Sequence, residues 1–368
     1  MHAPLTEHQT SARTDALAKV CPHFLLLETV DSTQNQLVRL TREHRNLQAW
    51  TTILAHHQTD GRGKYQRRWL DTSGKSLLCS TLLHCHDTHL PWITLLAGLA
   101  TLRALRQHKR NTELWPTGHF QLKWPNDIMI GEQKVGGILS EHIDTLPQKE
   151  TSATSSAAST SKTIHRVAIG LGINLTAAPQ FPDYPATSLT HTSPQTVNVP
   201  QLSIELLTLY LSAFQELLTS SWQHWHLEYT SHMYGRGKMT TISQPYVMTT
   251  HQLDSHEQIS LQKQPPEALS PCETLSHTYH AERIKNKHFT SEASTRNLYA
   301  RIDGINSQGA LVLTDIHAQT HILTSADVGL ADHSQHDSRA ALSQRELSSG
   351  FSPTNCSHNA TKIKENLT

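Results

Sequence analysis

A series of short apolar runs, each bounded by polar or turn-forming residues, most constrains how this 368-residue chain can fold. Runs of this length are typical of β-strands. In the first half of the chain, strands are expected over residues 24–27, 49–56, 76–83, 121–124, 128–130, 135–141 and 166–174. Shorter runs at residues 299–305, 310–315 and 321–324 indicate a second, smaller group of strands near the C-terminal end.

Helical patterns lie between these runs. Pro91 opens an apolar helix that is expected to continue to about Arg110, with the proline in its favoured first turn. Residues 200–229 carry one long Leu-rich helical pattern, and the sequence Asp-Ser-Thr at residues 31–33 is a helix-start signal. Both helices and strands are therefore expected in the first 230 residues.

Changes in composition predict how the chain is divided. A low-complexity Ser/Thr/Ala-rich segment at residues 145–163 separates two expected strands and is read as a long exposed loop. The expected organisation is a polar lead at residues 1–20, a main domain at 21–233 that carries this loop, a small β domain at 234–330 interrupted by a polar insert at 244–296, and a disordered tail at 331–368.

Charge and cysteine content exclude some classes of protein. The formal net charge is zero, so nothing in the overall charge suggests a nucleic-acid binder. The five cysteines are odd in number and scattered, which is no disulfide framework and fits a reducing compartment. The first residues lack the apolar core of a signal peptide, and the apolar stretch at residues 92–100 is too short to span a bilayer. We therefore expect a soluble cytoplasmic protein that does not enter membranes.

Metal binding has little support in the sequence. His84-Cys85-His86 contains ligand types, but no second ligand pair follows with the spacing of a zinc site. These residues are better explained as the ordinary end of a strand. No protein metal ligand is assigned.

The first segment that suggests chemistry is Gln58-Thr59-Asp60-Gly61-Arg62-Gly63-Lys64-Tyr65-Gln66-Arg67-Arg68-Trp69. Its glycines permit close approach of the backbone to a ligand, and its four cations suit an anion such as phosphate. The spacing of a Walker A loop is absent. The alternative is a solvated basic turn.

For three further segments, a ligand-binding role and an ordinary structural role are likewise both open. Lys123-Trp124-Pro125-Asn126-Asp127 places a lysine at a strand end before a rigid turn, as expected for a cation that positions an anion, although Pro-Asn-Asp also makes an ordinary β-turn. The segments at 134–141 and 170–174 place glycines in apolar strands, where glycine marks a close approach or a simple bulge. Neither has the complete dinucleotide fingerprint.

Taken together, the order of these segments resembles that of biotin–protein ligases. The resemblance covers about residues 24–230 and, more weakly, residues 298–330. Its specific part is the motif KWPND at residues 123–127 followed by KxxGIL, which is KVGGIL at residues 134–139. It implies an α/β (α+β) fold, with a mixed-sheet catalytic domain like those of biotin and lipoate ligases, followed by a small SH3-like β barrel.

The resemblance also implies roles for individual residues. Lys123 and Arg62 are expected to act in catalysis. Residues expected to bind biotin are Ser32, Thr33, Gln34, Gln58, Arg62, Gly63, Lys64 and Lys123. Residues expected to bind the adenylate or its phosphate are Gly61, Arg67, Trp69, Asn126, Lys134, Gly137 and Asn174. The chain departs from the family loop at Gln66, which replaces a glycine, and at Lys64, which replaces an arginine and cannot grip a phosphate bidentately.

By this resemblance, biotin would react with ATP to form biotinyl-5'-adenylate and pyrophosphate, with Mg²⁺ balancing the phosphate charge. A lysine of a biotin carboxyl carrier protein would then take the biotinyl group. No side-chain nucleophile is needed. The protein is expected to be a monomer or homodimer.

Three alternatives compete with this interpretation, one from the same superfamily and two from other classes. A lipoate–protein ligase shares the fold and the acyl-adenylate chemistry, but Gln58 and the basic loop favour biotin. A DNA-binding repressor would need an N-terminal helix-turn-helix, and only about 20 residues precede the first expected strand. A non-catalytic biotin-binding module would not need Lys123 or the loop cations. We therefore expect no DNA binding.

Overall fold

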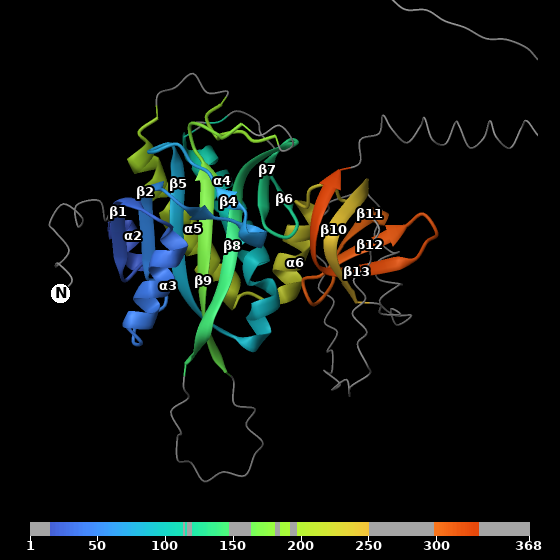
Figure 1. Cartoon of the computed structure of the whole chain (residues 1–368), viewed down its shortest axis with the longest axis horizontal. Helices are drawn as coiled ribbons and strands as arrows, with labels where there is room; N and C mark the ends of the chain where they lie inside the picture. The colour runs from blue at the N-terminus through green and yellow to red at the C-terminus, as the bar shows by residue number, and fades with distance from the viewer. Residues whose placement is uncertain are drawn as a thin grey trace, which may run out of the picture. The chain divides into compact units, whose positions relative to one another are not determined.

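The structure is a computed structural model that describes residues 15–112, 115, 120–146, 163–180, 185–191, 197–249 and 298–330. Its main feature is a seven-stranded mixed sheet, visible in the left half of Figure 1, with the order β1-β2-β5-β9-β8-β7-β6. The strands are β1 Phe24–Val30, β2 Thr52–Gln58, β5 Ser76–His86, β6 Phe120–Lys123, β7 Asp127–Ile130, β8 Gln133–Leu146 and β9 Ile164–Asn174. The mixed α/β class expected from the resemblance is thus confirmed.

The pairing of β5 with β9 brings the glycine-rich strand into the middle of the sheet. β1 and β2 are parallel, whereas the other neighbouring pairs are antiparallel. Gly170 lies opposite Ser80, and Gly172 lies opposite Leu78. Directly opposed residues point to the same face of a sheet. Because the two glycines have no side chain, they leave space on that face beside Ser80.

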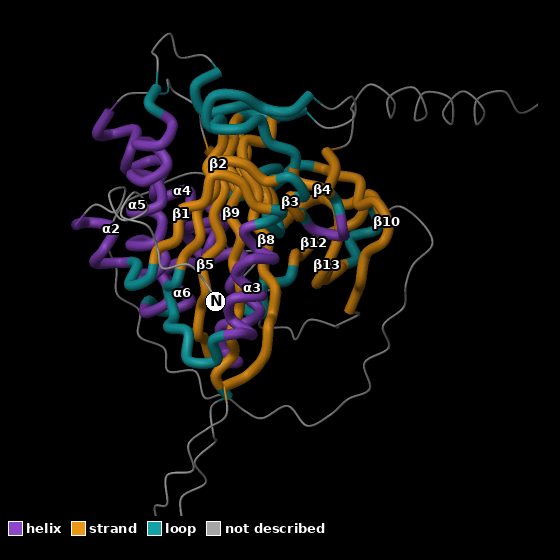
Figure 2. Tube along the Cα trace, turned by 60° about the vertical axis from the view of Figure 1, so that its left-hand side comes forward, coloured by secondary structure: helices purple, strands orange, loops and turns teal. Residues whose placement is uncertain are grey.

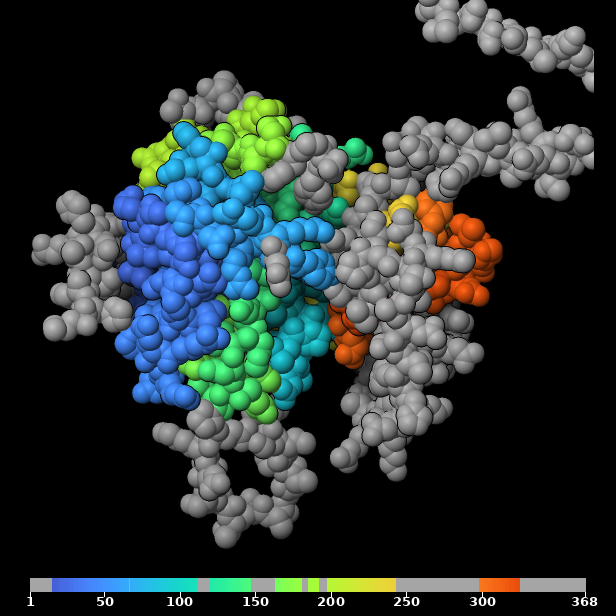
Figure 3. Space-filling model, viewed as in Figure 1, coloured from blue at the N-terminus to red at the C-terminus, as the bar shows by residue number. Residues whose placement is uncertain are grey.

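The two faces of the sheet are covered differently (Figure 2). Helices α4 (Ile93–Thr112) and α5 (Val199–Thr219) bury one face in a large apolar core. The other face carries α3 (Thr33–Glu43), which packs on a small apolar cluster made of Leu37, Val38, Ile53, Leu82 and Ala168. A small hairpin also lies on this second face. It consists of β3 (Gly61–Arg62) and β4 (Arg68–Trp69), joined by a 3₁₀ turn at Lys64–Gln66. Figure 3 shows the segments around α3 and this hairpin at the surface of one side.

Two helices differ from the sequence-based expectation. Pro91 lies inside a 3₁₀ helix at Asp87–Trp92, and α4 begins only at Ile93, so the placement of the proline in the first α-helical turn was wrong. The single long helix expected over residues 200–229 was also wrong, because α5 ends at Thr219 and a separate α6 runs over Trp222–Ser231.

The break between α5 and α6 has a local cause. Ser220 and Ser221 are extended, with ψ of 155° and 147°, and the Ser220 hydroxyl donates to the Glu216 carbonyl at 3.0 Å. Serine side chains compete with the helical hydrogen bonds in this way. The apolar spacing continues on both sides of the break, which is why periodicity alone did not reveal it.

Some expected segment limits also shift. The polar lead ends in a short helix, α2 (Asp15–Val20), whose Leu17 is fully buried and which packs on α5. β8 and β9 remain paired as far as Leu146 and Ile164, so strand structure enters the expected loop at 145–163, and residues 147–162 lie outside the described part. Strand β10 (Met239–Thr249) enters the expected insert at 244–296; the remainder of that insert and the expected tail at 331–368 are not among the described residues.

A second group of antiparallel strands follows, in the order β10-β11-β12-β13. The last three, β11 Leu298–Ile305, β12 Leu311–Asp315 and β13 Thr320–Leu330, lie where strands were expected. The Trp124 indole Nε1 donates to the Gly309 carbonyl at 3.0 Å, so the KWPND turn contacts the loop between β11 and β12. Within the described ranges, no helix has both the length and the apolar character needed to cross a bilayer.

Candidate active site

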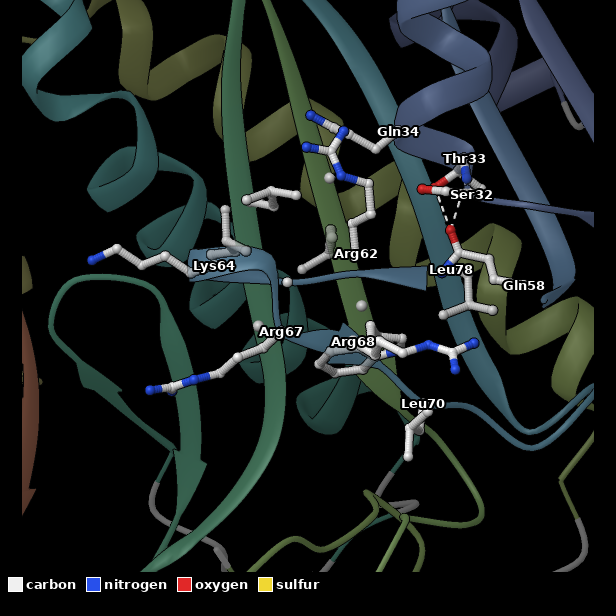
Figure 4. Close-up of a pocket in the computed structure, with 18 of the residues that line it drawn as sticks. Ser32, Thr33, Gln34, Gln58, Arg62, Lys64, Arg67, Arg68, Leu70 and Leu78 are labelled. Carbon is white, nitrogen blue, oxygen red and sulfur yellow. Dashed lines mark hydrogen bonds between the residues drawn. The ribbon is translucent and has the colours of Figure 1, made fainter. Parts of the chain in front are cut away.

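A cavity of about 760 Å³ lies on the face of the main sheet that carries α3 and the β3–β4 hairpin (Figure 4). It gathers most of the residues expected from the sequence. Those that line it are Ser32, Thr33, Gln34, Gln58, Arg62, Gly63, Lys64, Arg67, Trp69, Asn126, Lys134, Gly137 and Asn174. Gly61 and Lys123, although both are described, are not among the lining residues.

One end of the cavity is a buried polar network. The Gln58 Oε1 atom accepts from the Thr33 backbone N–H at 2.7 Å and from the Thr33 hydroxyl at 3.0 Å (dashed in Figure 4). The Thr33 and Ser80 hydroxyl oxygens are 2.9 Å apart, and the Ser80 hydroxyl donates to the Gln34 Oε1 at 3.0 Å. Because Thr33, Gln34 and Ser80 are at most 3% exposed, this end offers fixed hydrogen-bonding groups to an uncharged polar ligand.

Local structure explains why these groups converge. Ser32 is the N-cap of α3, so the helix begins at Thr33 and its first free N–H groups face the end of β2, where Gln58 lies. The Gln34 side chain is oriented by donation from Nε2 to the Ala168 carbonyl at 3.1 Å. Ser80 was missed in the sequence, although a small polar residue in the apolar strand at residues 76–83 is a detectable signal.

The hairpin carries four cations into or around the cavity. Gly61 pairs with Trp69 and Arg62 pairs with Arg68, and the Gly63 N–H donates to the Arg67 carbonyl at 2.7 Å. The side chains spread apart in Figure 4: Arg62 is directed toward Gln34, whereas Lys64 and Arg67 extend to the side opposite Arg68. This spacing can surround an extended anion.

An aromatic ring and a lysine form the wall beneath the hairpin. A Cβ atom at Gly172 would lie 2.7 Å from Trp69 ring atoms, and one at Gly137 would lie 3.3 Å from the same ring. Gly172 and Gly137 are therefore close-approach positions, which is one of the two interpretations that the sequence left open. The Lys134 Nζ lies 2.6 Å from Asp127 Oδ1 and 5.8 Å from the centre of the Trp69 ring, so charge and aromatic surface adjoin in this wall.

The two lysines of the KWPND and KVGGIL segments are placed differently. Lys123 is the last residue of β6 and its backbone pairs with Asp127. It does not line the cavity, whereas Lys134 does. Lys123 nevertheless adjoins the site through its backbone, because its carbonyl accepts from the Asn126 N–H at 3.2 Å, and both Asn126 and Lys134 line the cavity.

Two polar atoms in the cavity wall are buried without a hydrogen-bond partner in the described part of the chain. They are the Asn174 Oδ1, an acceptor, and the Trp69 Nε1, a donor. Asn174 itself is 2% exposed and its Nδ2 donates to the Thr187 carbonyl at 3.1 Å, which fixes its orientation. Since an unpaired buried polar group costs about 1–3 kcal/mol, a ligand that pairs with these atoms gains that energy.

The burial of the described cysteines and the grouping of the possible metal ligands bear on thiol and metal chemistry. Burial raises the pKa of the Cys79 thiol to about 12 and that of Cys85 to about 11, so both are protonated at neutral pH and are poor nucleophiles. Among the residues that the structure describes, no group of three or more His, Cys, Asp or Glu side chains could hold a metal ion. Asp127 is the carboxylate that lines the cavity.

The structure thus shows an α/β domain whose cavity has a buried polar end and a cluster of cations beside it. Residues 26–158 match the model of the biotin/lipoate A/B protein ligase family. This match covers about a third of the chain.

The chain is also similar to individual ligases. The chain is 31% identical over 140 residues to a biotin–[acetyl-CoA-carboxylase] ligase of Mycobacterium tuberculosis, a match that covers 37% of this chain and 44% of that one. It is 27% identical over 224 residues to the bifunctional ligase/repressor BirA of Bacillus spizizenii, covering 58% and 61% of the two chains. This chain thus spans about half the length of these curated relatives.

A solved structure agrees in fold. The biotin protein ligase from Aquifex aeolicus in complex with biotin and ATP superposes with a TM-score of 0.51 and 21% identity. The superposition covers 84% of this chain and 98% of that one. At this level of identity, the likeness establishes the architecture.

Proposed function

We propose that this protein is a biotin–protein ligase, which forms biotinyl-5'-adenylate from biotin and ATP and then transfers biotin to a lysine of a biotin carboxyl carrier protein. One observation carries the proposal: a single cavity joins the buried polar end near Gln34 to the cationic hairpin and the Trp69 wall. Such a cavity can hold an uncharged ring system and a nucleotide side by side.

The polar end suits the ring of biotin. The amides of Gln34 and Gln58 and the hydroxyls of Thr33 and Ser80 supply both donors and acceptors. None of these groups is charged. This favours an uncharged ring that offers N–H and carbonyl groups over a purely apolar one, and it distinguishes biotin from lipoate.

The cationic part suits the adenylation step. A biotin carboxylate oxygen would attack the α-phosphorus of ATP, forming a new O–P bond while the bond to the bridging oxygen breaks and pyrophosphate leaves. Arg62, Lys64, Arg67 and Lys134 line the same cavity and would reduce the repulsion between the two anions. They would also stabilise the charge that develops on the phosphoryl group.

We infer that Lys134, rather than Lys123, supplies the positioned charge of this step. Lys134 is only 22% exposed in its side chain and is held by the ion pair with Asp127. A lysine held in this way loses little freedom when an anion binds. Lys123 was expected in this role because it stands before the Pro turn, but its position outside the cavity lining favours a different role.

Other parts of the assignment are also proposals. Mg²⁺ bound to the ATP phosphates would neutralise the leaving pyrophosphate, and Asp127 is the carboxylate that the cavity offers beside it. We propose that β10 to β13 correspond to the SH3-like barrel of the family, since the strands are antiparallel neighbours in sequence order. The hairpin would shield the adenylate, a mixed anhydride, from water until a carrier lysine attacks its acyl carbon.

The decisive test mixes the protein with biotin, ATP, Mg²⁺ and a biotin carboxyl carrier domain, and reads the carrier by mass spectrometry and the release of pyrophosphate. Biotin-dependent release and a biotinylated carrier are expected, and lipoate should not replace biotin. Biotin binding without release would favour a non-catalytic module instead.

A pair of lysine variants tests the assignment of the charge. Lys134→Ala should lower the rate of adenylation about a hundredfold, as loss of one preorganised charge contact does. Lys123→Ala, the matched control, should stay within a few-fold of wild type. The opposite ranking would restore Lys123 as the acting lysine.

A further inference from the structure

Arg62 ties the hairpin to two other elements. Its Nη1 donates to the Asn35 Oδ1 on α3 at 2.9 Å and to the Glu141 Oε2 on β8 at 3.0 Å. The side chains of Arg62 and Glu141 are 43% and 32% exposed, so the ion pair by itself contributes little. Asn35 is the second described contact that fixes the guanidinium.

The orientation of the Asn35 amide is set by Asp31. The Asn35 Nδ2 donates to the Asp31 Oδ2 at 3.3 Å, and a carboxylate can only accept. The amide oxygen of Asn35 consequently faces Arg62. If the amide turned over, its NH₂ group would meet the guanidinium, which has no acceptor.

Asp31 is in turn held by Arg39. The two Arg39 terminal nitrogens lie 2.8 Å and 2.7 Å from the two Asp31 oxygens, a bidentate fork. The hydrogen bonds from Arg39 hold the pKa of Asp31 well below its usual range, so its carboxylate stays ionised at neutral pH. The Asp31 carbonyl also accepts from the Asp60 N–H at 2.8 Å, directly before the hairpin.

We infer that Asp31 and Asn35 are positioning residues that orient Arg62 toward the anionic part of the ligand. The inference rests on the proposed function, in which Arg62 neutralises the adenylate. Both described contacts use Nη1, which leaves the other N–H groups of the guanidinium to bind the ligand. The order of contact is Arg39 to Asp31, Asp31 to Asn35, and Asn35 to Arg62.

A first experiment needs no activity. In the ligand-free protein, the rate at which phenylglyoxal modifies each arginine is read by peptide mass spectrometry. Asn35→Ala should raise the rate at Arg62 several-fold and leave Arg68 unchanged, since Arg68 bonds to the Thr59 carbonyl instead. Asp31→Asn should act in the same direction, and it serves if Asn35→Ala does not fold. Unchanged reactivity of Arg62 in folded variants overturns the inference.

A second experiment is a double-mutant cycle on adenylation. Asn35→Ala should lower kcat/KM about tenfold when Arg62 is present and cause no further loss in an Arg62→Ala background. Arg42→Ala, an exposed residue of the same helix, should leave the rate unchanged. An equal loss in both backgrounds would mean that Asn35 acts only on the fold, which overturns the inference. If the wild-type protein forms no adenylate, the proposed function fails, and the reactivity of Arg62 still decides this inference.

Discussion

Substitution of Gly172 by alanine tests whether the Trp69 ring shapes the nucleotide part of the cavity. The added Cβ would lie 2.7 Å from the Trp69 Cε2 and Cζ2 atoms, whereas an ordinary contact begins at 3.4 Å. The ring must therefore move by about 0.7 Å, or the strand must shift by a similar distance. Displacements of about 1 Å at a binding group cost up to about a hundredfold in rate. We expect a loss of about ten- to a hundredfold.

The loss should appear in the use of ATP rather than of biotin. Pyrophosphate release is measured while ATP is titrated at saturating biotin, and the affinity for biotin alone is measured by calorimetry. Gly172→Ala should raise the KM for ATP, and biotin should bind within a few-fold of wild type because the hydrogen-bonding groups of the polar end belong to Thr33, Gln34, Gln58 and Ser80, not to the Trp69 ring. An unchanged KM for ATP would refute the assignment of this wall to the nucleotide.

Gly98→Ala is the matched control for this substitution. A Cβ at Gly98 would meet only the ends of the Ile138 and Leu122 side chains, each at 3.6 Å. Gly98 lies within α4, where alanine stabilises a helix by about 0.5–1 kcal/mol over glycine. The control should therefore retain full activity and unfold at a slightly higher temperature. Loss of activity in both variants would indicate a general sensitivity to added methyl groups.

Changing both Lys64 and Arg67 to glycine should speed the escape of the adenylate, because both cations line the cavity. The escaped adenylate should raise biotin labelling of an unrelated protein, and unchanged labelling by an active variant would contradict this. Replacing residues 148–160 by a short Gly-Ser linker should change the free energy of unfolding by no more than about 1 kcal/mol in urea denaturation. The reason is that Leu146 and Ile164 are already paired, so a short linker can join them; a larger loss of stability would show that the segment packs.

Much of the site could be predicted because its chemistry lies in contiguous segments. The Gln58–Trp69 segment forms one hairpin that carries its cations into the cavity, so sequence order and spatial order agree there. The strand glycines at 137 and 172 were recognisable since glycine within an apolar strand marks a close approach. What they approach, the Trp69 ring, could not be known without the pairing of β8 with β9.

Features that rest on a single polar side chain, or on competition between hydrogen bonds, were not recognised in the sequence. Lys134 was expected among the adenylate-binding residues and lines the cavity, whereas the role expected for Lys123 stays a prediction. Ser80 and Asn35 each contribute a single polar group, and neither was named among the expected site residues. The break at Ser220 depends on a serine hydroxyl bonding to Glu216, which the apolar spacing around it does not report.

The two hydroxyls at the polar end of the cavity form a chain whose hydrogens can run in either of two directions. Thr33 can donate to Ser80 and Ser80 to Gln34, or Ser80 can donate to Thr33 and Thr33 to Gln58, because either oxygen can be the donor between them. Each hydroxyl has only one hydrogen, so the two amide oxygens cannot both receive a hydroxyl hydrogen while the contact between the hydroxyls is also bonded. The Gln58 Oε1 already accepts from the Thr33 N–H, so a ligand N–H bound there would take the place of the Thr33 hydroxyl hydrogen and turn the whole chain toward Gln34. The occupied pocket would then have a single proton arrangement where the empty one has two.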